Sequence, residues 1–208
     1  MIYDNGMKKI LSKNKGFTLV ETMVAISILM LAILGPLSIA STSLRNVVLA
    51  RDQITAYYLA QEGIEYVRYV RDNQYIKSIQ QNNPNLQWSL SADVSAGGGG
   101  LGECFIENNE YGCGIDIFAF FSNPNTNVIS CPRPTSSNIT GCAVLKKDAN
   151  GFYTYQTGAN MTPTTFRRTI KIERIETGKE IKVEAIVEWQ TNNIRKDFTI
   201  TEHILNIY

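Results

Sequence analysis

An apolar run near the N-terminus constrains this chain more than any other feature. Residues 17–40 contain a single ionisable side chain, that of Glu21. As a helix this run would extend about 36 Å at ~1.5 Å per residue, enough to cross a hydrocarbon core of about 30 Å. The sequence therefore predicts a membrane-spanning helix. A carboxylate within a span costs about 2.5–3.5 kcal/mol, so Glu21 requires a local partner or a function.

The residues just before the span carry a recognisable signal. Gly16-Phe17-Thr18-Leu19-Val20-Glu21 follows a short lysine-rich leader and opens the apolar run. This arrangement resembles the class III signal of type IV pilins and type II secretion pseudopilins. The resemblance implies that prepilin peptidase cuts after Gly16 and methylates the new N-terminal residue, Phe17. It also implies that Glu21 is the residue through which subunits assemble.

Two local partners could stabilise the Glu21 carboxylate. Cleavage before Phe17 would create an α-ammonium group at the membrane, and such a cation favours a nearby carboxylate in low dielectric. The free N–H groups and macrodipole at the N-terminus of the helix also favour negative charge there. The sequence alone leaves both partners open.

A secretory signal peptide is the main alternative for this segment, because Ser38-Ile39-Ala40 is a small-x-small site that signal peptidase could accept. The length of the apolar run and the acid within it favour a retained anchor. Lysines before the span place the N-terminus in the cytoplasm and the rest outside, in the periplasm or at the cell surface. Met7 could be the true start. The leader removed at Gly16 carries four lysines and one aspartate, which leaves a net charge of −2.

Beyond the span, the sequence predicts a continuing helix. Gly35-Pro36 predicts a kink, because proline removes a backbone donor and clashes with the preceding turn. Residues 41–73 read as an amphipathic helix, which brings the expected helix to roughly 80 Å at ~1.5 Å per residue. Gln61 and Glu62 are expected on its solvated face. The apolar positions are Leu44, Val47, Val48, Ile54, Tyr58, Ile64, Val67 and Val70.

The middle of the chain is expected to be loop-rich. Residues 74–102 end in a glycine run that indicates a connector, and no P-loop context surrounds it. Four cysteines follow, and an oxidising compartment favours local pairs Cys104–Cys113 and Cys131–Cys142 among three possible connectivities. A zinc site is the alternative. Residues 115–121 have strand character, with Phe118 and either Phe120 or Phe121 expected in the core.

Two regions show clear β patterns. Residues 144–153 predict a hairpin, with Asn150-Gly151 supplying positive φ angles, and Asp148 and Asn150 only weakly resemble a calcium loop. Residues 166–208 predict a three-stranded antiparallel meander with alternating apolar residues. His203 lies in its last strand and is expected to be structural. The expected apolar face contains Ile170, Ile172, Ile181, Val183, Ala185, Val187, Trp189, Phe198, Ile200 and Ile204, with Ile175 as a further candidate.

These segments define the expected organisation as an α+β protein whose long N-terminal helix packs on an antiparallel sheet in a pilin-like head. Residues 58–68 are similar to the same helix in V-class minor pilins, and residues 166–208 resemble the closing strands of minor pilins and I/J-class pseudopilins. The expected parts are a leader (1–16), a transmembrane half-helix (17–40), an amphipathic half-helix (41–73), a loop-rich, cysteine-containing part (74–165) and the meander (166–208).

The expected function is that of a minor pilin or pseudopilin in a type IV pilus or a type II secretion pseudopilus. The expected partners are prepilin peptidase, other pilin or pseudopilin subunits, an inner-membrane assembly platform and, before assembly, membrane lipid. The near-neutral charge does not indicate nucleic-acid binding. No catalytic residues, metal or cofactor are expected. The alternative is a signal-anchored cell-surface enzyme or binding domain that uses the helix only as a tether.

Overall fold

The chain forms two compact units, Met1–Val47 and Val48–Tyr208. A computed structural model describes residues 16–82, 100–122, 128–133, 141–191 and 193–206, with the side chains of residues 120–122 left out. The leader lysines, Met7, the glycines at 97–99 and the side chains of Phe120 and Phe121 therefore lie outside the described part. We call the second unit the head.

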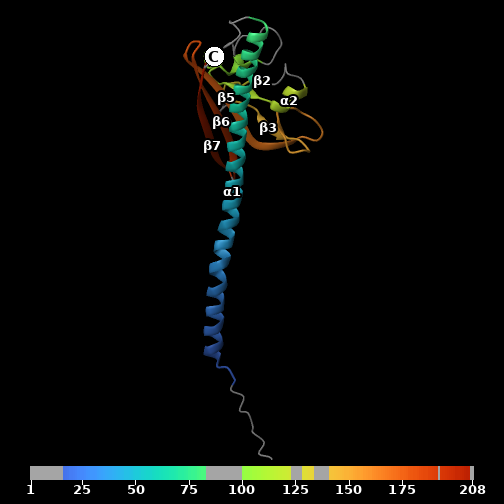
Figure 1. Ribbon diagram of the computed structural model, residues 1–208. Coiled ribbons are helices and arrows are strands. Elements are labelled where there is room, and N and C mark those ends of the chain that lie inside the picture. The colour runs from blue at the N-terminus through green and yellow to red at the C-terminus, as the bar shows by residue number, and fades with distance from the viewer. Residues whose placement is uncertain (1–15, 83–99, 123–127, 134–140, 192, 207–208) are drawn as a thin grey trace, which may run out of the picture. The chain divides into compact units, whose positions relative to one another are not determined.

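The first unit contains the beginning of helix α1 (Leu19–Gln80) (Figure 1). Its large apolar side chains are exposed from Phe17 to Ile39. By length and composition α1 can cross a membrane, as predicted. The helical assignment continues through Gly35 and Pro36, and a Cβ at Gly35 would meet no neighbouring atom. The kink at this position stays a prediction.

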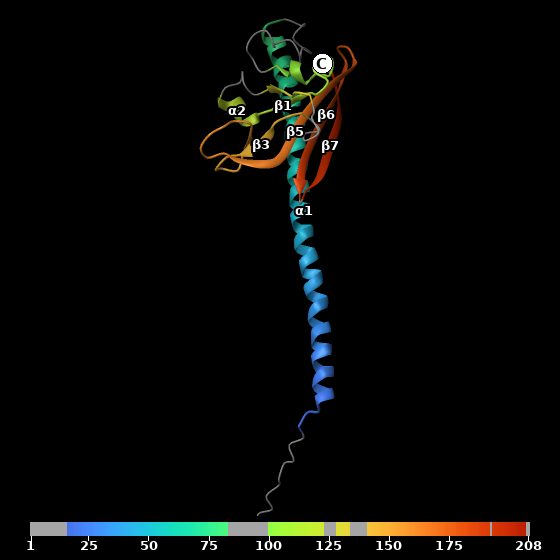
Figure 2. The same cartoon turned by 180° about the vertical axis from the view of Figure 1, so that it is seen from behind.

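Within the head, α1 packs on one face of a seven-stranded sheet (Figures 1 and 2). Its contact face differs from the predicted one, because Ile54 and Tyr58 are exposed while Ile64 and Val67 are buried. Small residues of α1 face the sheet, and side chains of β5 pack directly against them at Gly63. The buried positions of α1 are Ala56, Leu59, Ala60, Gly63, Ile64, Tyr66, Val67, Gln74 and Ser78.

The predicted C-terminal meander is present as β5 (Thr162–Glu176), β6 (Glu180–Thr191) and β7 (Ile194–Leu205), all antiparallel. Gly178 and Asn193 adopt positive φ angles of 76° and 63° in the two turns. Alternate side chains of β6 face the helix, and Ile175, the further candidate, is exposed instead. The buried face contains Phe166, Ile170, Ile172, Ile181, Val183, Ala185, Val187, Trp189 and Ile204, with Phe198 and Ile200 partly buried against it.

Shorter elements complete the sheet beside β5. Strand β1 (Cys113–Ile115) pairs with β2 (Val128–Ser130) and with β5, and the 3₁₀ helix η2 (Leu101–Cys104) precedes them. The predicted loop over residues 74–102 is therefore wrong at both ends, because α1 continues to Gln80 and Leu101 and Gly102 are buried in η2.

The predicted strand over residues 115–121 is also wrong beyond Ile115. Residues from Ile117 to Ser122 form helix α2. The carboxylate of Asp116 accepts a hydrogen bond from the backbone N–H of Ala119 at 3.0 Å, which caps the first turn of this helix. Phe118 is half-buried and stacks on the exposed ring of Phe152, so it does not belong to the core.

The predicted hairpin is formed by β3 (Val144–Lys147) and β4 (Tyr153–Thr154). Gly151 has a positive φ of 95°, whereas Asn150 does not, contrary to the prediction. Asp148 organises the loop, because its carboxylate accepts hydrogen bonds from the backbone N–H of Phe152 at 2.7 Å and from the side chain of Asn150 at 3.2 Å. This pattern explains the Asp-x-Asn spacing as a turn.

Polar contacts along α1 set its register on the sheet. The Thr191 hydroxyl donates to Asp52 at 2.7 Å, and the Arg68 guanidinium pairs with Glu202 at 2.6 Å. Between these two contacts, the Arg168 guanidinium pairs with Glu62 at 2.5 Å. Polar side chains of α1 therefore help to hold the helix to the sheet, and one of them, Glu62, was expected on the solvated face.

A substitution at Gly63 tests the close approach of α1 to β5. Alanine favours a helix over glycine by about 1 kcal/mol. A Cβ at this position would nevertheless lie 2.5 Å from Cδ1 of Ile170, which is fully buried. We expect overpacking to outweigh propensity, so that Gly63→Ala lowers the free energy of unfolding by about 1–2 kcal/mol in urea titrations in detergent.

Ile170→Val provides the control, because valine lacks Cδ1 and the remaining Cγ1 would lie at an ordinary 3.5 Å. Alone it should cost about 0.5–1.5 kcal/mol. The double variant should lose less stability than the sum of the two single variants. Full additivity would contradict the proposed contact.

Candidate functional site

The N-terminus of α1 brings the predicted processing and assembly residues together. The backbone N–H of Glu21 donates to the hydroxyl of Thr18 at 3.2 Å. In return the Glu21 carboxylate accepts from the backbone N–H of Thr18 at 3.5 Å. This reciprocal pair is a capping box, in which each side chain satisfies a free backbone donor of the first turn.

The capping box includes Thr18, a residue that was not predicted from the sequence to take part in this site. Thr18 lies three positions before Glu21, and this Thr-x-x-Glu spacing could have identified the motif. Cleavage between Gly16 and Phe17 would leave the Thr18 amide intact, so the capping box would persist in the processed chain. Only Oε2 of Glu21 takes part in this motif.

Gly16 and Phe17 lie in an exposed, non-helical segment directly before the helix, and the Phe17 side chain is 80% exposed. A Cβ at Gly16 would meet no atom within 4 Å, and its φ lies outside the left-handed region. Neither side-chain packing nor backbone conformation therefore requires glycine at position 16. A requirement at the cleavage step would account for glycine better than packing does.

Comparisons with known proteins support this interpretation. Residues 11–35 match the family model for the prokaryotic N-terminal methylation motif. No curated protein and no solved structure matches the chain significantly. The match covers the leader boundary, Phe17, Glu21 and Gly35. The chain therefore carries a type IV pilin-like prepilin signal, which implies processing by prepilin peptidase.

The head is held together by two disulfide bonds, Cys104–Cys113 and Cys131–Cys142, the pairs expected from their spacing. All four cysteines are buried. The side-chain amide of Asn109 connects the two bridges by donating to the carbonyl oxygens of Gly112 at 2.7 Å and Cys131 at 3.2 Å. These bonds join segments within the loop-rich part of the head, and the pairing of Cys113 with Ile170 connects that part to β5.

The most buried charged side chain of the head is that of Arg168, with no exposed surface. Its guanidinium donates to the carbonyl oxygens of Leu59 in α1 at 3.0 Å and Ile115 at 2.5 Å, and to the Glu62 carboxylate. Its Nε has no partner among the described residues. The prediction that Glu62 belongs to a purely solvated face is therefore wrong. Gln61 is exposed, as expected.

A buried carboxylate lies beside this arginine. Asp116 accepts hydrogen bonds from the hydroxyl of Thr154 and the backbone N–H of Tyr155, both at 2.7 Å. The Tyr155 hydroxyl donates to the carbonyl oxygen of Arg168 at 3.0 Å, and burial raises the pKa of Tyr155 to about 12. These groups are occupied in joining α1, β1, β4 and β5.

The head residues that the sequence singled out do not converge on a reactive cluster. His203 lies on β7 and its Nδ1 contacts the Glu180 carboxylate on β6 at 2.6 Å, in an exposed cross-strand pair. Within the described ranges no group of three His, Cys, Asp or Glu side chains could hold a metal ion. The matched methylation motif lies instead at the leader boundary and the N-terminus of α1.

Processing can be tested directly on protein extracted from membranes. Intact-mass and peptide mass spectrometry should show a chain that begins at N-methylated Phe17. Gly16→Val should leave the leader attached, because the exposed segment tolerates the side chain structurally while the peptidase does not accept it. A mature N-terminus at Ser41 would instead identify a secretory signal.

Replacing Arg168 should destabilise the head strongly. Methionine at this position would leave the buried carbonyl groups of Leu59 and Ile115 without a donor, so we expect a loss of about 3 kcal/mol in urea titrations. Glu62→Gln is the matched control. It should cost less than about 1 kcal/mol, since the Glu62 side chain is 40% exposed and the arginine keeps its carbonyl partners. Equal losses would show that the ion pair dominates.

Proposed function

We propose that this chain is a minor pilin or pseudopilin that is incorporated into, or initiates, an envelope-spanning filament. Its span holds the subunit in the membrane until an assembly platform transfers it to the filament. The observation that carries the proposal is the position of Glu21, one turn inside an otherwise apolar, exposed stretch of helix and within the matched methylation motif.

The physical argument rests on the cost of this carboxylate. Within a bilayer the capping box supplies one hydrogen bond of 3.5 Å to Glu21, which offsets only part of a cost of about 2.5–3.5 kcal/mol. A neighbouring subunit that presents the α-ammonium of its own Phe17 could supply the missing charge. This contact would make Glu21 favour association over the isolated membrane state.

The proposal includes prepilin peptidase and other pilin or pseudopilin subunits as partners, and it assigns no catalytic activity. Support for a building-block role comes from the head, where the buried charged groups are occupied in joining elements. The alternative function is a membrane-tethered surface domain. A passive tether needs the apolar helix but has no use for Glu21.

Two substitutions separate capping from assembly at Glu21. Glu21→Gln removes the charge but keeps an N3 side chain that can complete a capping box. Thr18→Val removes the capping hydroxyl but keeps the charge. We expect the Gln variant to be inserted and cleaved normally yet to be absent from sheared filaments, measured by immunoblotting of membrane and filament fractions.

Thr18→Val should be incorporated at close to the normal level, because losing the cap costs about 0.5–2 kcal/mol of local helix stability while the assembly charge remains. The reverse result, with normal incorporation of Glu21→Gln and failure of Thr18→Val, would mean that Glu21 acts only as a cap. Normal incorporation of both variants would favour the tether function.

A further inference from the structure

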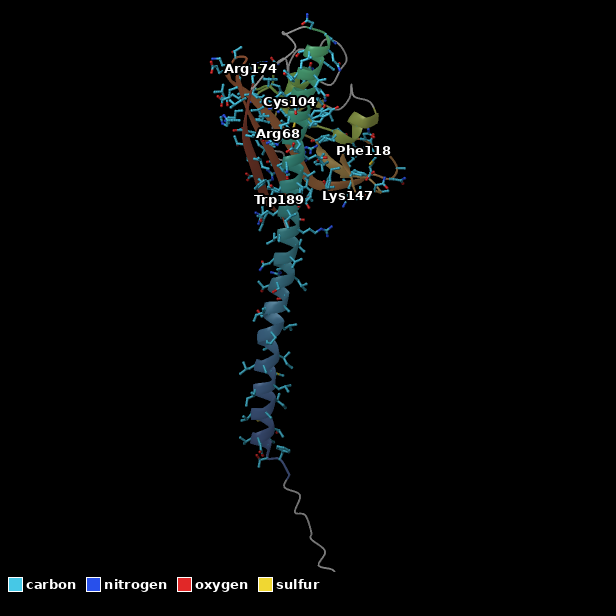
Figure 3. All side chains as sticks on the ribbon, viewed as in Figure 1. Arg68, Cys104, Phe118, Lys147, Arg174 and Trp189 are labelled. Atoms are coloured by element: carbon cyan, nitrogen blue, oxygen red, sulfur yellow. A yellow bond between two sulfur atoms is a disulfide. The ribbon has the colours of Figure 1, made fainter. Side chains whose placement is uncertain are left out.

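Two hairpins of the head turn at the same end of the sheet. The β6–β7 turn closes at the pair Thr191↔Ile194. The β3–β4 hairpin reaches this end because Lys147 pairs with Thr162, the first residue of β5, and β5 begins opposite the end of β6. Figure 3 shows Lys147 and Trp189 at this end and Arg174 at the opposite one.

Each hairpin tip presents a large exposed apolar side chain beside two basic residues. In the β3–β4 hairpin, Phe152 is 58% exposed and Lys146 and Lys147 precede the loop. In the β6–β7 hairpin, Ile194 is 62% exposed and is followed by the exposed Arg195 and Lys196. Exposed apolar residues flanked by Lys or Arg are typical of segments that lie in a membrane interface.

Acidic side chains also lie at this end, where Asp148, Glu188 and Asp197 stand against the basic Lys146, Lys147, Arg195 and Lys196. The Asp148 carboxylate is turned into its own loop, where it accepts from Phe152 and Asn150. Asp197 is the acid that lines a shallow hollow together with Arg195, Lys196, Trp189 and two residues of α1, Leu49 and Gln53.

At the opposite end of the sheet the lysines are paired with acids. Around the β5–β6 turn, the acids Glu173, Glu176 and Glu180 are equal in number to the basic residues Arg174, Lys179 and Lys182. Lys179 and Lys182 are paired with Glu176 and Glu173. The end of the sheet where Thr191 contacts Asp52 therefore differs from the β5–β6 end in the pairing of its lysines, and it lies near the start of the helical segment of the head.

Chain length limits how far this end can be from a membrane. Residues 41–47 separate the predicted span from the head, and these seven residues reach at most about 25 Å when fully extended. We propose that the end of the head formed by the β3–β4 and β6–β7 tips binds the surface of an anionic lipid bilayer, with Phe152 and Ile194 entering the interface and Lys147 and Lys196 contacting lipid phosphates.

This binding orients the head while the subunit is held in the membrane, and assembly into a filament would have to release it. The inference needs only the membrane anchor, so it holds for a filament subunit and for a tethered domain alike. Attraction to an anionic surface is worth roughly a factor of five in equilibrium constant for each basic residue and weakens within a Debye length.

The test uses the full processed chain in lipid nanodiscs of phosphatidylcholine alone or with about one-third phosphatidylglycerol. Amide hydrogen exchange is followed by mass spectrometry in peptides covering residues 147–153 and 193–198. Exchange at both tips should slow in the anionic discs at low salt and recover when salt is raised. Lys147→Gln with Lys196→Gln should weaken the slowing roughly 25-fold, the product of two factors of about five.

Matched variants at the opposite end provide the control. Lys179→Gln and Ile175→Ser change exposed residues of the same types there and should leave the slowing at the tips unchanged, whereas Phe152→Ser should reduce it. Amide exchange in the β5–β6 core should be the same in every variant, which verifies that each variant is folded. The salt titration on the unmodified chain tests the electrostatic contribution without any substitution.

Two outcomes would overturn the proposal. Equal exchange at the tips in neutral and anionic discs would show that the lipid charge is not recognised. Slowing that follows the number of chains in each disc, independent of lipid charge, would assign the tips to a contact with a second copy of the chain.

Discussion

The close packing of α1 on the sheet is the contact on which the rest of the head depends. Small residues at Ala56, Ala60 and Gly63 bring the helix so near to β5 that a single methyl group at Gly63 would meet Ile170 at 2.5 Å. This approach places the Leu59 carbonyl within reach of the Arg168 guanidinium. Because that guanidinium also binds Ile115, the helix, the central strand and the loop-rich part are joined at one point.

The loop-rich part of the head is stabilised differently from the meander. Its strands β1 and β2 contain three residues each, too few to form an apolar face comparable to that of β6. Two buried disulfide bonds, the amide of Asn109 and the carboxylate of Asp116 replace the missing apolar contacts. A head of this kind combines a regular sheet with a covalently fastened surface region.

The N-terminal segment combines two physical roles in one carboxylate. Glu21 completes a capping box with Thr18, and it is also the one acid of residues 17–40, where the large apolar side chains are exposed. The capping box fixes where the helix begins, and thereby the distance between Phe17 and the carboxylate. A helix start defined in this way would hold the new N-terminus and the acid in a constant relation in every subunit.

Many features of this protein could be predicted from short-range patterns in its sequence. The span follows from composition, and the meander follows from period-two alternation confirmed in β5, β6 and β7. The cleavage boundary at Gly16/Phe17 and the assembly role of Glu21 were inferred from the resemblance to type IV pilins and stay predictions. The cysteines form the two local disulfide bonds that were expected, with sequence separations of nine and eleven residues.

Long-range partners decided what the sequence did not show. The burial of Arg168 depends on carbonyl groups from two distant segments, and its pairing with Glu62 reversed the interpretation of a residue that hydropathy placed in solvent. Asp116 turned a strand-like sequence into α2 because its carboxylate caps Ala119 while binding Thr154 across the head. The face of α1 that contacts the sheet includes small residues such as Ala56, Ala60 and Gly63. The spacing of large apolar residues along the helix does not identify such a face.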